Sequence, residues 1–274
     1  MLKKIFNADD FGMTLGVNAA IKRAYEEGIL NSASLMVNQK YAIQAVEMAK
    51  NMPNLELGLH LNLTNETPAA NPADIPLLVG DDGKLRNGFV NLLLLSVFKP
   101  REFKAQIEKE VWAQTQKYLA FGLPLKHIDG HRHVHLIPAV FKVVKKIAEA
   151  HNGARIRVMN ENIFNTIRQN KAKSWLFDGG LIKYIILRAL TWWNCYKSDT
   201  YFYSILYTCK LSKEQFQNVQ IPQGYKAVEI MIHPATPEID REHLEDVWDE
   251  SVLSPYRTQE LEVLLDKDVL KGIN

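Results

Sequence analysis

Short apolar runs and longer amphipathic runs alternate along the chain. The short runs predict β-strands, and the longer ones, with an apolar residue at every third or fourth position, predict helices that bury one face. Gly28 and Pro53 mark where the first two helices should end. The predicted strands cover residues 2–8, 32–37, 55–63, 127–130, 154–159 and 225–232, and the predicted helices cover residues 16–28, 42–51, 103–119, 140–151 and 258–265.

This alternation predicts an α/β fold. Strands and helices that follow one another through short links form parallel sheets with right-handed crossovers. A length of 274 residues suits a single-domain (β/α) barrel over residues 1–274, complete or lacking a strand. A doubly wound open sheet is the alternative. Segments 65–99 and 160–208 interrupt the alternation, and we expect both to be insertions on the loop side of the barrel.

Composition narrows the class of protein further. Hydrophobic residues make up 47% and charged residues 23%, which excludes a disordered or fibrous chain. A net charge of +2 predicts no bulk affinity for nucleic acid. Two cysteines are too few for a disulfide scaffold, so we expect a reducing compartment. No signal peptide or membrane-spanning stretch is visible, which favours a soluble, cytoplasmic protein.

Polar residues stand at the ends of four predicted strands. Asp9 and Asp10 follow the first, His60 lies in the third, four of the eight histidines fall within 127–135, and His233 ends the strand that begins at residue 225. Each spot alone has an ordinary structural explanation, such as a helix N-cap or a hydrogen-bonded core histidine. The carboxyl ends of parallel strands meet at one edge, however, where barrel enzymes place their sites. We therefore expect these side chains to converge.

The histidine-rich segment is the hardest to explain by folding alone. Carboxylates combined with two or more imidazoles are typical of hydrolytic metal sites, and Asp129 could orient one imidazole from behind. The chain has no Gly-x-Ser-x-Gly elbow, Walker loop or dinucleotide-binding motif, and neither cysteine has a histidine close to it in sequence. If the segment stays extended, one side carries His127, Asp129, His131, His133 and His135.

Four motifs together give a family resemblance. They lie at residues 7–12 (Asn-Ala-Asp-Asp-Phe-Gly), 58–60 (Gly-Leu-His), 127–135 (His-Ile-Asp-Gly-His-Arg-His-Val-His) and 232–234 (Ile-His-Pro). In order and spacing they resemble the YdjC-like family of carbohydrate deacetylases, which includes chitooligosaccharide deacetylases and a hopanoid-biosynthesis-associated branch. The resemblance implies a distorted TIM-like (β/α) barrel of the glycoside hydrolase/deacetylase type.

The resemblance also implies roles for individual residues. Asp10, His60 and His131 would hold one divalent cation, Asp9 would be the general base and His233 the general acid. The family favours Mg²⁺, whereas two imidazoles and a carboxylate also suit Zn²⁺. The implied reaction removes the acetyl group from an N-acetylated amino sugar in an oligosaccharide or glycolipid. Further residues expected at the substrate are His133, His135 and Asn62.

Two alternative functions remain open at this point. The first is a sugar- or lipid-binding barrel that has lost catalysis. The second is a metal-dependent phosphoester hydrolase, although a second metal would normally need more carboxylates than these motifs supply. An assay that compares acetate with phosphate release separates all three functions.

Apolar stretches in the two insertions predict a surface contact. Residues 161–200 carry six Lys and Arg against three Asp and Glu, and the apolar run 181–193 includes Trp192 and Trp193. Apolar area, cations and tryptophan are what a helix at a membrane surface uses. We expect either a peripheral contact with the inner face of the membrane, aided by residues 90–98, or packing on the barrel or in a homodimer.

Overall fold

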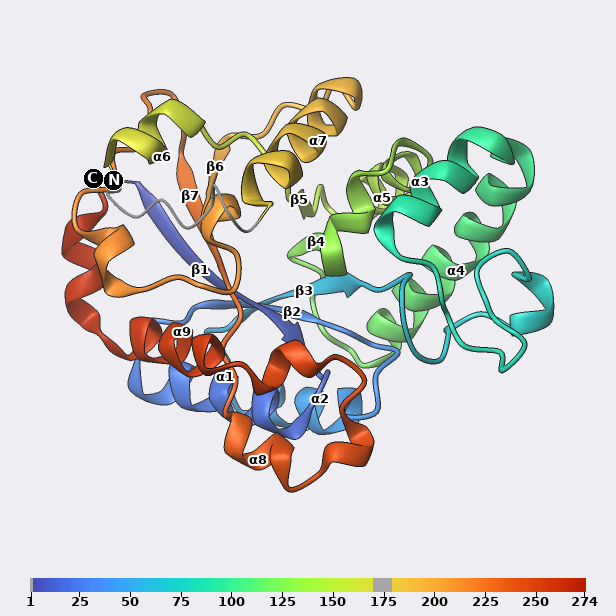
Figure 1. The fold of residues 1–274 in the computed structure, drawn as a ribbon, viewed down its shortest axis with the longest axis horizontal. Helices are drawn as coiled ribbons and strands as arrows, with labels where there is room; N and C mark the ends of the chain where they lie inside the picture. The colour runs from blue at the N-terminus through green and yellow to red at the C-terminus, as the bar shows by residue number, and fades with distance from the viewer. Residues whose placement is uncertain (1, 170–178) are drawn as a thin grey trace.

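Figure 1 shows a computed structural model that describes residues 2–169 and 179–274. Seven parallel strands form one sheet in the order β5-β4-β3-β2-β1-β7-β6. The edge strands β5 and β6 do not pair with each other, so the part of the chain described here forms an open half-barrel. The strands are β1 (Lys3–Phe11), β2 (Ser32–Leu35), β3 (Glu56–Leu61), β4 (His127–Gly130), β5 (Arg155–Ile156), β6 (Thr200–Tyr203) and β7 (Ala227–Ile232).

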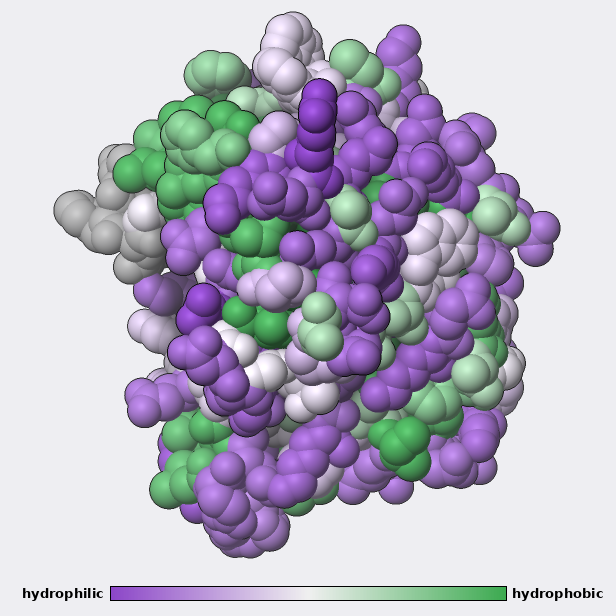
Figure 2. All heavy atoms as spheres, turned by 90° about the vertical axis from the view of Figure 1, so that its right-hand side faces the viewer, coloured by the Kyte–Doolittle hydropathy of each residue, from purple (hydrophilic) through white to green (hydrophobic). Residues whose placement is uncertain are grey.

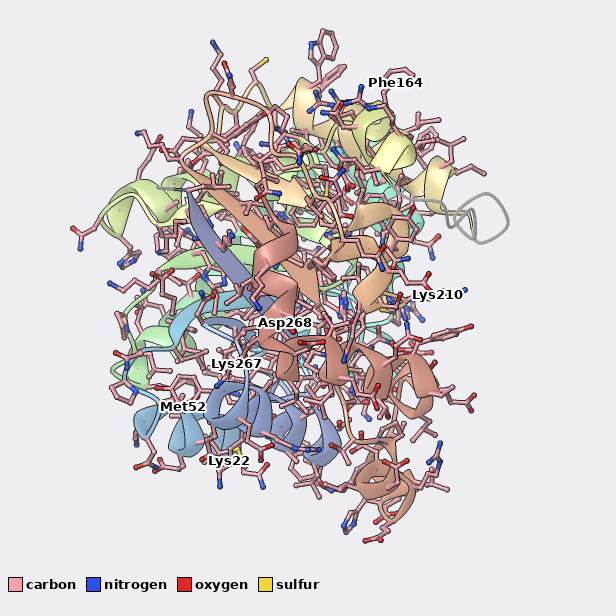
Figure 3. All side chains as sticks on the ribbon, turned by 90° about the vertical axis from the view of Figure 1, so that its left-hand side faces the viewer. Lys22, Met52, Phe164, Lys210, Lys267 and Asp268 are labelled. Atoms are coloured by element: carbon pink, nitrogen blue, oxygen red, sulfur yellow. The ribbon has the colours of Figure 1, made fainter. Side chains whose placement is uncertain are left out.

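Helices surround the sheet, and the two chain ends lie side by side (Figure 1). Among the described residues, every helix is too short or too polar to cross a bilayer. In Figure 3, Lys22 and Phe164 lie at opposite ends of the molecule, with the C-terminal residues Lys267 and Asp268 between them. The helices are α1 (Leu15–Glu27), α2 (Ala42–Lys50), α3 (Phe89–Phe98), α4 (Pro100–Ala120), α5 (Pro138–Ala150), α6 (Ile163–Gln169), α7 (Gly180–Trp193), α8 (Pro237–Arg241) and α9 (Pro255–Leu265).

The sheet lies in the interior of the molecule, and most of its polar residues are buried together with its apolar ones. Every residue of β2, β4, β6 and β7 is buried, as expected for a parallel sheet covered on both faces. The helix α1 shows how one face is buried, because Val17, Ala20, Ile21 and Ala24 recur at helical spacing and are all inaccessible to solvent. Its first turn begins where the Thr14 side chain accepts a hydrogen bond from the Val17 amide.

The structure confirms the α/β barrel-like fold and differs from the sequence analysis in detail. Strand β1 runs on to Phe11, so Asp9 and Asp10 lie within the strand rather than after it. Segment 160–208, expected as an insertion, also contains a strand of the sheet, β6, which pairs with β7. The pattern did not reveal β6 because a buried strand of four residues has neither alternation nor length to distinguish it.

Candidate active site

A bulge in β1 brings two adjacent carboxylates to the same site. Successive side chains of a regular strand point to opposite faces. The register of β1 against β2 shifts between Ala8 and Phe11, and Asp10 has a φ of +67°. This irregular backbone lets Asp9 and Asp10 line one cavity. A non-glycine residue in the left-handed region carries a conformational cost of roughly 1–3 kcal/mol, which is typical of functional sites.

Two histidines from neighbouring strand ends meet Asp10. Nδ1 of His131 lies 2.9 Å from Asp10 Oδ1, and Nε2 of His60 lies 3.4 Å from the same oxygen. One ligand atom from each of the three residues lies within 4.8 Å of the others. All three side chains are buried, and Arg257 donates to the second oxygen, Asp10 Oδ2, over 3.1 Å. Oδ1 therefore remains directed toward the two imidazoles.

The second nitrogen of His60 is fixed from behind. Its Nδ1 lies 2.8 Å from Asp129 Oδ1, which leaves Nε2 directed toward Asp10. Asp129 thus orients one imidazole, as the sequence analysis expected. Burial disfavours the charged imidazolium, but the carboxylates of Asp129 and Asp9 outweigh it and raise the pKa of His60 to about 10 in the ion-free arrangement.

Gly58 precedes His60 because another imidazole occupies the space beside it. A Cβ atom at Gly58 would lie 2.3 Å from Cδ2 of His127. His127 in turn lies 3.0 Å from the Ser34 hydroxyl through Nε2. Burial and the Arg155 cation lower the pKa of His127 to about 4, so it is a neutral residue of the supporting layer. The Gly-Leu-His motif is therefore explained by packing and by chemistry together.

A single buried arginine joins the carboxylates beneath the site. Arg157 donates to both oxygens of Asp9 at 2.6 and 2.7 Å, to Glu229 at 2.7 Å, and lies 2.6 Å from Asp129. Burial opposes its charge, yet the three carboxylates raise the pKa of Arg157 well above its usual value. Asn7 also donates to Asp9 Oδ1 over 2.8 Å. The orientation of Asp9 is thereby fixed.

His233 faces Asp9 from the end of β7. Its Nε2 lies 3.8 Å from Asp9 Oδ2, its Nδ1 lies 3.7 Å from Glu260 Oε2, and its backbone amide donates to Glu260 over 2.5 Å. The thiol of Cys209 is also within hydrogen-bonding range of the imidazole. Burial disfavours the charged form, but Cys209, Glu260 and Asp9 raise the pKa of His233 well above its usual value. His233 is therefore protonated near neutral pH.

These groups line a cavity of about 180 Å³. A larger hollow of about 730 Å³ runs along α7 but is lined by none of the acid–histidine cluster, so size alone does not locate the chemistry here. The small cavity combines residues from strand ends, from α7 and from the C-terminal helix. Its lining consists of Asp9, Asp10, His60, Gly130, His131, Arg132, His133, Lys183, Thr208, Cys209, His233, Asp249, Ser251 and Arg257.

The histidine-rich segment does not stay extended. It leaves the strand at Gly130 and forms a short 3₁₀ turn, with φ of +53° at Arg132 and +59° at His133. The turn places His133 in the lining of the cavity, whereas His135 Nε2 bonds to the Arg157 carbonyl oxygen over 3.0 Å. The expected common side of this segment is therefore wrong beyond Gly130.

Asn62 lies just after β3, outside the lining of the cavity. Its side chain donates to the Asn65 carbonyl and accepts from the Thr64 amide and hydroxyl, which shapes the loop. The substrate roles assigned to Asn62, His133 and His135 stay predictions, and only His133 among them lines the cavity.

The similarity to known proteins covers the residues of the candidate site. A protein-family model described as YdjC-like protein matches residues 3–274. The chain belongs to the YdjC-like family. A relative named carbohydrate deacetylase from Brevibacillus brevis is 34% identical over the whole chain and 95% of its own length. Relatives of the same name from Vibrio campbellii and Geobacillus stearothermophilus are 38% and 40% identical, over 54% and 53% of the chain and 56% and 55% of their own lengths.

A solved structure shares the fold of this YdjC-like protein. It is the crystal structure of a protein from Enterococcus faecalis described as a cellobiose-phosphate cleavage protein. The similarity has a TM-score of 0.66 with 23% identity, and it covers 99% of this chain and 94% of the other. At this identity the likeness concerns the fold alone.

The donor set at Asp10 fits a divalent metal. His131 Nε2 is buried with no hydrogen-bond partner, and both imidazoles direct a nitrogen toward one carboxylate oxygen. A second group, Asp9 with His60 and Asp129, is equally close together. Its two carboxylates are already bound by the Arg157 guanidinium. The first group is therefore the better candidate for a metal site, and the assignment of its residues as ligands stays a prediction.

Sequence reasoning missed several residues of the site. Arg157 and Glu260 lie within the predicted strand 154–159 and the predicted helix 258–265. Arg257 lies just before that helix, and Lys183 lies in the apolar run 181–193. Cys209 was set aside for want of a nearby histidine in sequence, yet it lies beside His233 in space. An available signal is the pair Arg155 and Arg157, two charges within the otherwise apolar predicted strand 154–159.

Proposed function

We propose that this protein is a metal-dependent hydrolase that removes the N-acetyl group from an N-acetylated amino sugar in an oligosaccharide or glycolipid. The observation that carries the proposal is the convergence of Asp10, His60 and His131 on one point, with Asp9 and His233 in the same cavity. The substrate class is supported by the carbohydrate deacetylase name of the relative that matches over the full chain.

The proposed metal ligands are Asp10, His60 and His131. A divalent cation there supplies Lewis-acid polarisation of the acetamide carbonyl and activation of water. Family resemblance favours Mg²⁺ and the two imidazole ligands favour Zn²⁺, and metal analysis of the purified protein distinguishes them. Asp129 holds the ring of His60 in the orientation that this role requires.

Asp9 is the proposed general base. Arg157 and Asn7 fix its carboxylate, and Oδ2 lies on the side that faces His233 and the cavity. A base positioned in this way takes the proton from the attacking water. The two adjacent carboxylates would then have different roles. Asp10 would be neutralised as a metal ligand, and Asp9 would remain free to accept a proton.

His233 is the proposed general acid. Cleavage of an amide releases an amine, which must be protonated as it leaves. The raised pKa of His233 favours a proton on the ring, and its Nε2 lies 3.8 Å from Asp9 Oδ2, so the proposed acid and base are neighbours in one cavity. His133, with its buried and unpartnered Nδ1, is the proposed contact for a polar substrate group. His135 and Asn62 are proposed to support the lining from outside it.

The structure disfavours the phosphoester hydrolase alternative. Two-metal hydrolysis needs a second set of ligands. The second acid–histidine group shares His60 with the first, and Arg157 binds its carboxylates. The alternative of a binding protein without catalysis would leave the paired carboxylates and the protonated His233 without a role.

A substrate panel tests the proposal. The metal-loaded protein is incubated with N-acetylated chitooligosaccharides, with the corresponding glucose oligomers and with phosphorylated sugars, and released acetate and phosphate are measured. We expect acetate from the first group alone. Release of phosphate, or failure to release acetate with either Mg²⁺ or Zn²⁺, would contradict the proposed reaction.

The exposed face of α7 supports a finer part of the proposal. Ile182, Trp192 and Trp193 are 67%, 78% and 68% exposed, so the helix does not bury them against the barrel. Val97 and Phe98 of α3 are also exposed. The face of the molecule in Figure 2 is mainly hydrophilic, with separate hydrophobic patches. Exposed tryptophans with apolar neighbours are typical of helices at a membrane surface. A peripheral contact with the inner face of the membrane is therefore proposed.

Flotation with anionic liposomes tests this contact. The wild-type protein should float at low salt, and the double substitution Trp192→Ala with Trp193→Ala should weaken flotation. Sedimentation of the protein without lipid measures whether it forms a homodimer. A homodimer that the same double substitution disrupts would replace the membrane proposal. Both cysteines are free thiols, the form that a reducing cytoplasm maintains, so the cytoplasm remains the proposed compartment.

A further inference from the structure

Cys209 is a thiol placed inside the candidate active site. It lines the same cavity as Asp9 and His233, and it is partly accessible to solvent. Its thiol is within hydrogen-bonding range of the His233 imidazole, and the Arg257 guanidinium adds a second positive charge nearby. The proposed deacetylation assigns no step to this thiol, so its presence needs a separate explanation.

The backbone conformation at Cys209 argues that its side chain does more than fill space in the cavity. Its φ is +60°, a conformation that favours glycine. The preceding residue is held firmly, because Thr208 donates to the Ile205 carbonyl over 2.7 Å and accepts from Lys183 over 3.1 Å. The thiol is therefore held in a fixed position beside His233, at a backbone cost that a glycine would avoid.

The cavity that contains the thiol is also lined by a polar group without a hydrogen-bond partner. His133 is 3% exposed, lines the same cavity, and its Nδ1 has no hydrogen-bond partner. Burial raises the pKa of the Cys209 thiol, but the cations of His233 and Arg257 outweigh it and lower that pKa below the usual value. Accessible thiols with cationic neighbours are the ones that hydroperoxides oxidise.

We propose that Cys209 is a reversible oxidation site that switches off the proposed deacetylation. The thiolate attacks a peroxide oxygen, the S–O bond forms, the O–O bond breaks, and the leaving hydroxide takes a proton to become water. Sulfur loses two electrons to the peroxide and becomes a sulfenic acid. Two equivalents of a small thiol reverse the change, because they return the cysteine thiol and form one disulfide and one water.

Loss of activity follows from the position of the new oxygen. It would occupy the cavity next to His233 and compete for the proton that the leaving amine needs. The only other cysteine of the chain, Cys195, lines the separate hollow along α7 and contacts the Trp192 carbonyl at 3.5 Å. Cys195 is thus a natural control, because it is more exposed but remote from the candidate catalytic groups.

The experiment compares the wild type with Cys195→Ser, Cys209→Gly and Cys209→Ser. Glycine suits the backbone at position 209 and should fold, and serine keeps a polar group there. Each metal-loaded protein is treated with hydrogen peroxide, and acetate release is expressed relative to the same protein before treatment. Metal content is measured in parallel. Dimedone labelling with peptide mass spectrometry locates the sulfenic acid independently of activity.

We expect the wild type and Cys195→Ser to lose activity about tenfold and to recover with dithiothreitol. Both position-209 variants should keep their own activity, and the dimedone adduct should lie on Cys209. Equal inactivation of Cys209→Gly, or an adduct confined to Cys195, would overturn the proposal. The inference rests on the proposed function for its consequence. If no protein releases acetate, the proposed function fails, while the adduct position still supports or overturns the oxidation site.

Discussion

The two sides of the candidate cavity are built in different ways. One side, which we call the strand side, consists of Asp10, His60 and His131 at the ends of three strands that lie close together in the sheet. The other, the loop side, consists of Lys183 and Cys209, contributed by α7 and the turn after residues 205–207. Hydrogen bonds to buried partners fix the strand side, whereas the loop side comes from a helix outside the sheet, α7, and from an irregular turn.

This difference indicates that the proposed chemistry depends more on the strand side than on the loop side. Rigid elements hold catalytic groups more closely than loops do. The strand side should therefore be intolerant of substitution, because each residue is both a proposed ligand and a hydrogen-bond partner of its neighbours. The loop side should tune binding and access, and substitutions there should cost less. Single substitutions on each side test this difference through their effects on activity, metal content and stability.

The largest effect should come from a proposed metal ligand. Asp10→Asn removes the negative charge of the proposed ligand and replaces one carboxylate oxygen with an amide NH2. The protein should therefore lose its metal and roughly 10³-fold or more of kcat/KM, since a metal contributes several kcal/mol. Metal content and acetate release measure both effects. The matched control is Asp74→Asn, because the carboxylate of Asp74 is exposed and pairs only with the surface residue Lys109 in the described structure. Retained metal and turnover in Asp10→Asn would make the strand side no different from the loop side.

The next effect separates the two adjacent carboxylates. Asp9→Asn should keep the metal, because the three ligands remain, yet lower kcat by roughly 10²–10⁴-fold through loss of a positioned base. The measurements are metal content and kcat for the same preparation. Loss of the metal together with activity would instead make Asp9 a ligand, and near wild-type turnover would remove it from the reaction.

A third substitution tests the layer beneath the strand side. Arg157→Met leaves the carboxylates of Asp9 and Asp129 buried without their arginine and leaves Glu229 with Arg155 alone. Removal of one partner from such a buried network costs about 3–5 kcal/mol. The free energy of unfolding in urea measures it. The control is Arg155→Met, which removes a bond to Glu229 alone. Equal destabilisation by both variants would contradict the central role of Arg157.

The smallest effect should come from the loop side. Lys183 lines the cavity and donates to Thr208 over 3.1 Å, so Lys183→Met removes one charged hydrogen-bond donor. If the ammonium donates to a substrate group in the cavity, such a bond is worth about 1.5–3 kcal/mol, which predicts a loss of roughly 10- to 100-fold in kcat/KM with the metal retained. Lys197→Met, in the hollow along α7, is the control. A loss as large as that of Asp10→Asn would erase the contrast between the two sides.

The same contrast explains what the sequence could predict. Asp10 and His60 lie near the ends of β1 and β3, and His131 follows β4, so the rule that parallel strands end at one edge was enough to predict that they converge. The bulge at Asp10 was not predictable, because a one-residue shift leaves the hydrophobic pattern unchanged. It is nevertheless what lets Asp9 and Asp10 face the same cavity.

The loop side was missed for a physical reason. Lys183 lies in a run whose apolar residues suggested a surface helix, and only the position of α7 over the cavity turns this side chain inward. The contact between Cys209 and His233 joins residues 24 apart in the chain, across the strand β7. Long-range contacts of this kind are set by packing, which a local pattern does not encode.

The most direct test of the account is a metal titration of the stripped protein. The metal is removed with a chelator, Mg²⁺ or Zn²⁺ is returned stepwise, and bound metal and acetate release from an N-acetylated chitooligosaccharide are followed together. The account predicts that activity rises in proportion to bound metal, saturates at one ion per chain, and is absent in Asp10→Asn. Full activity in the stripped protein, or saturation only at two ions per chain, would contradict it.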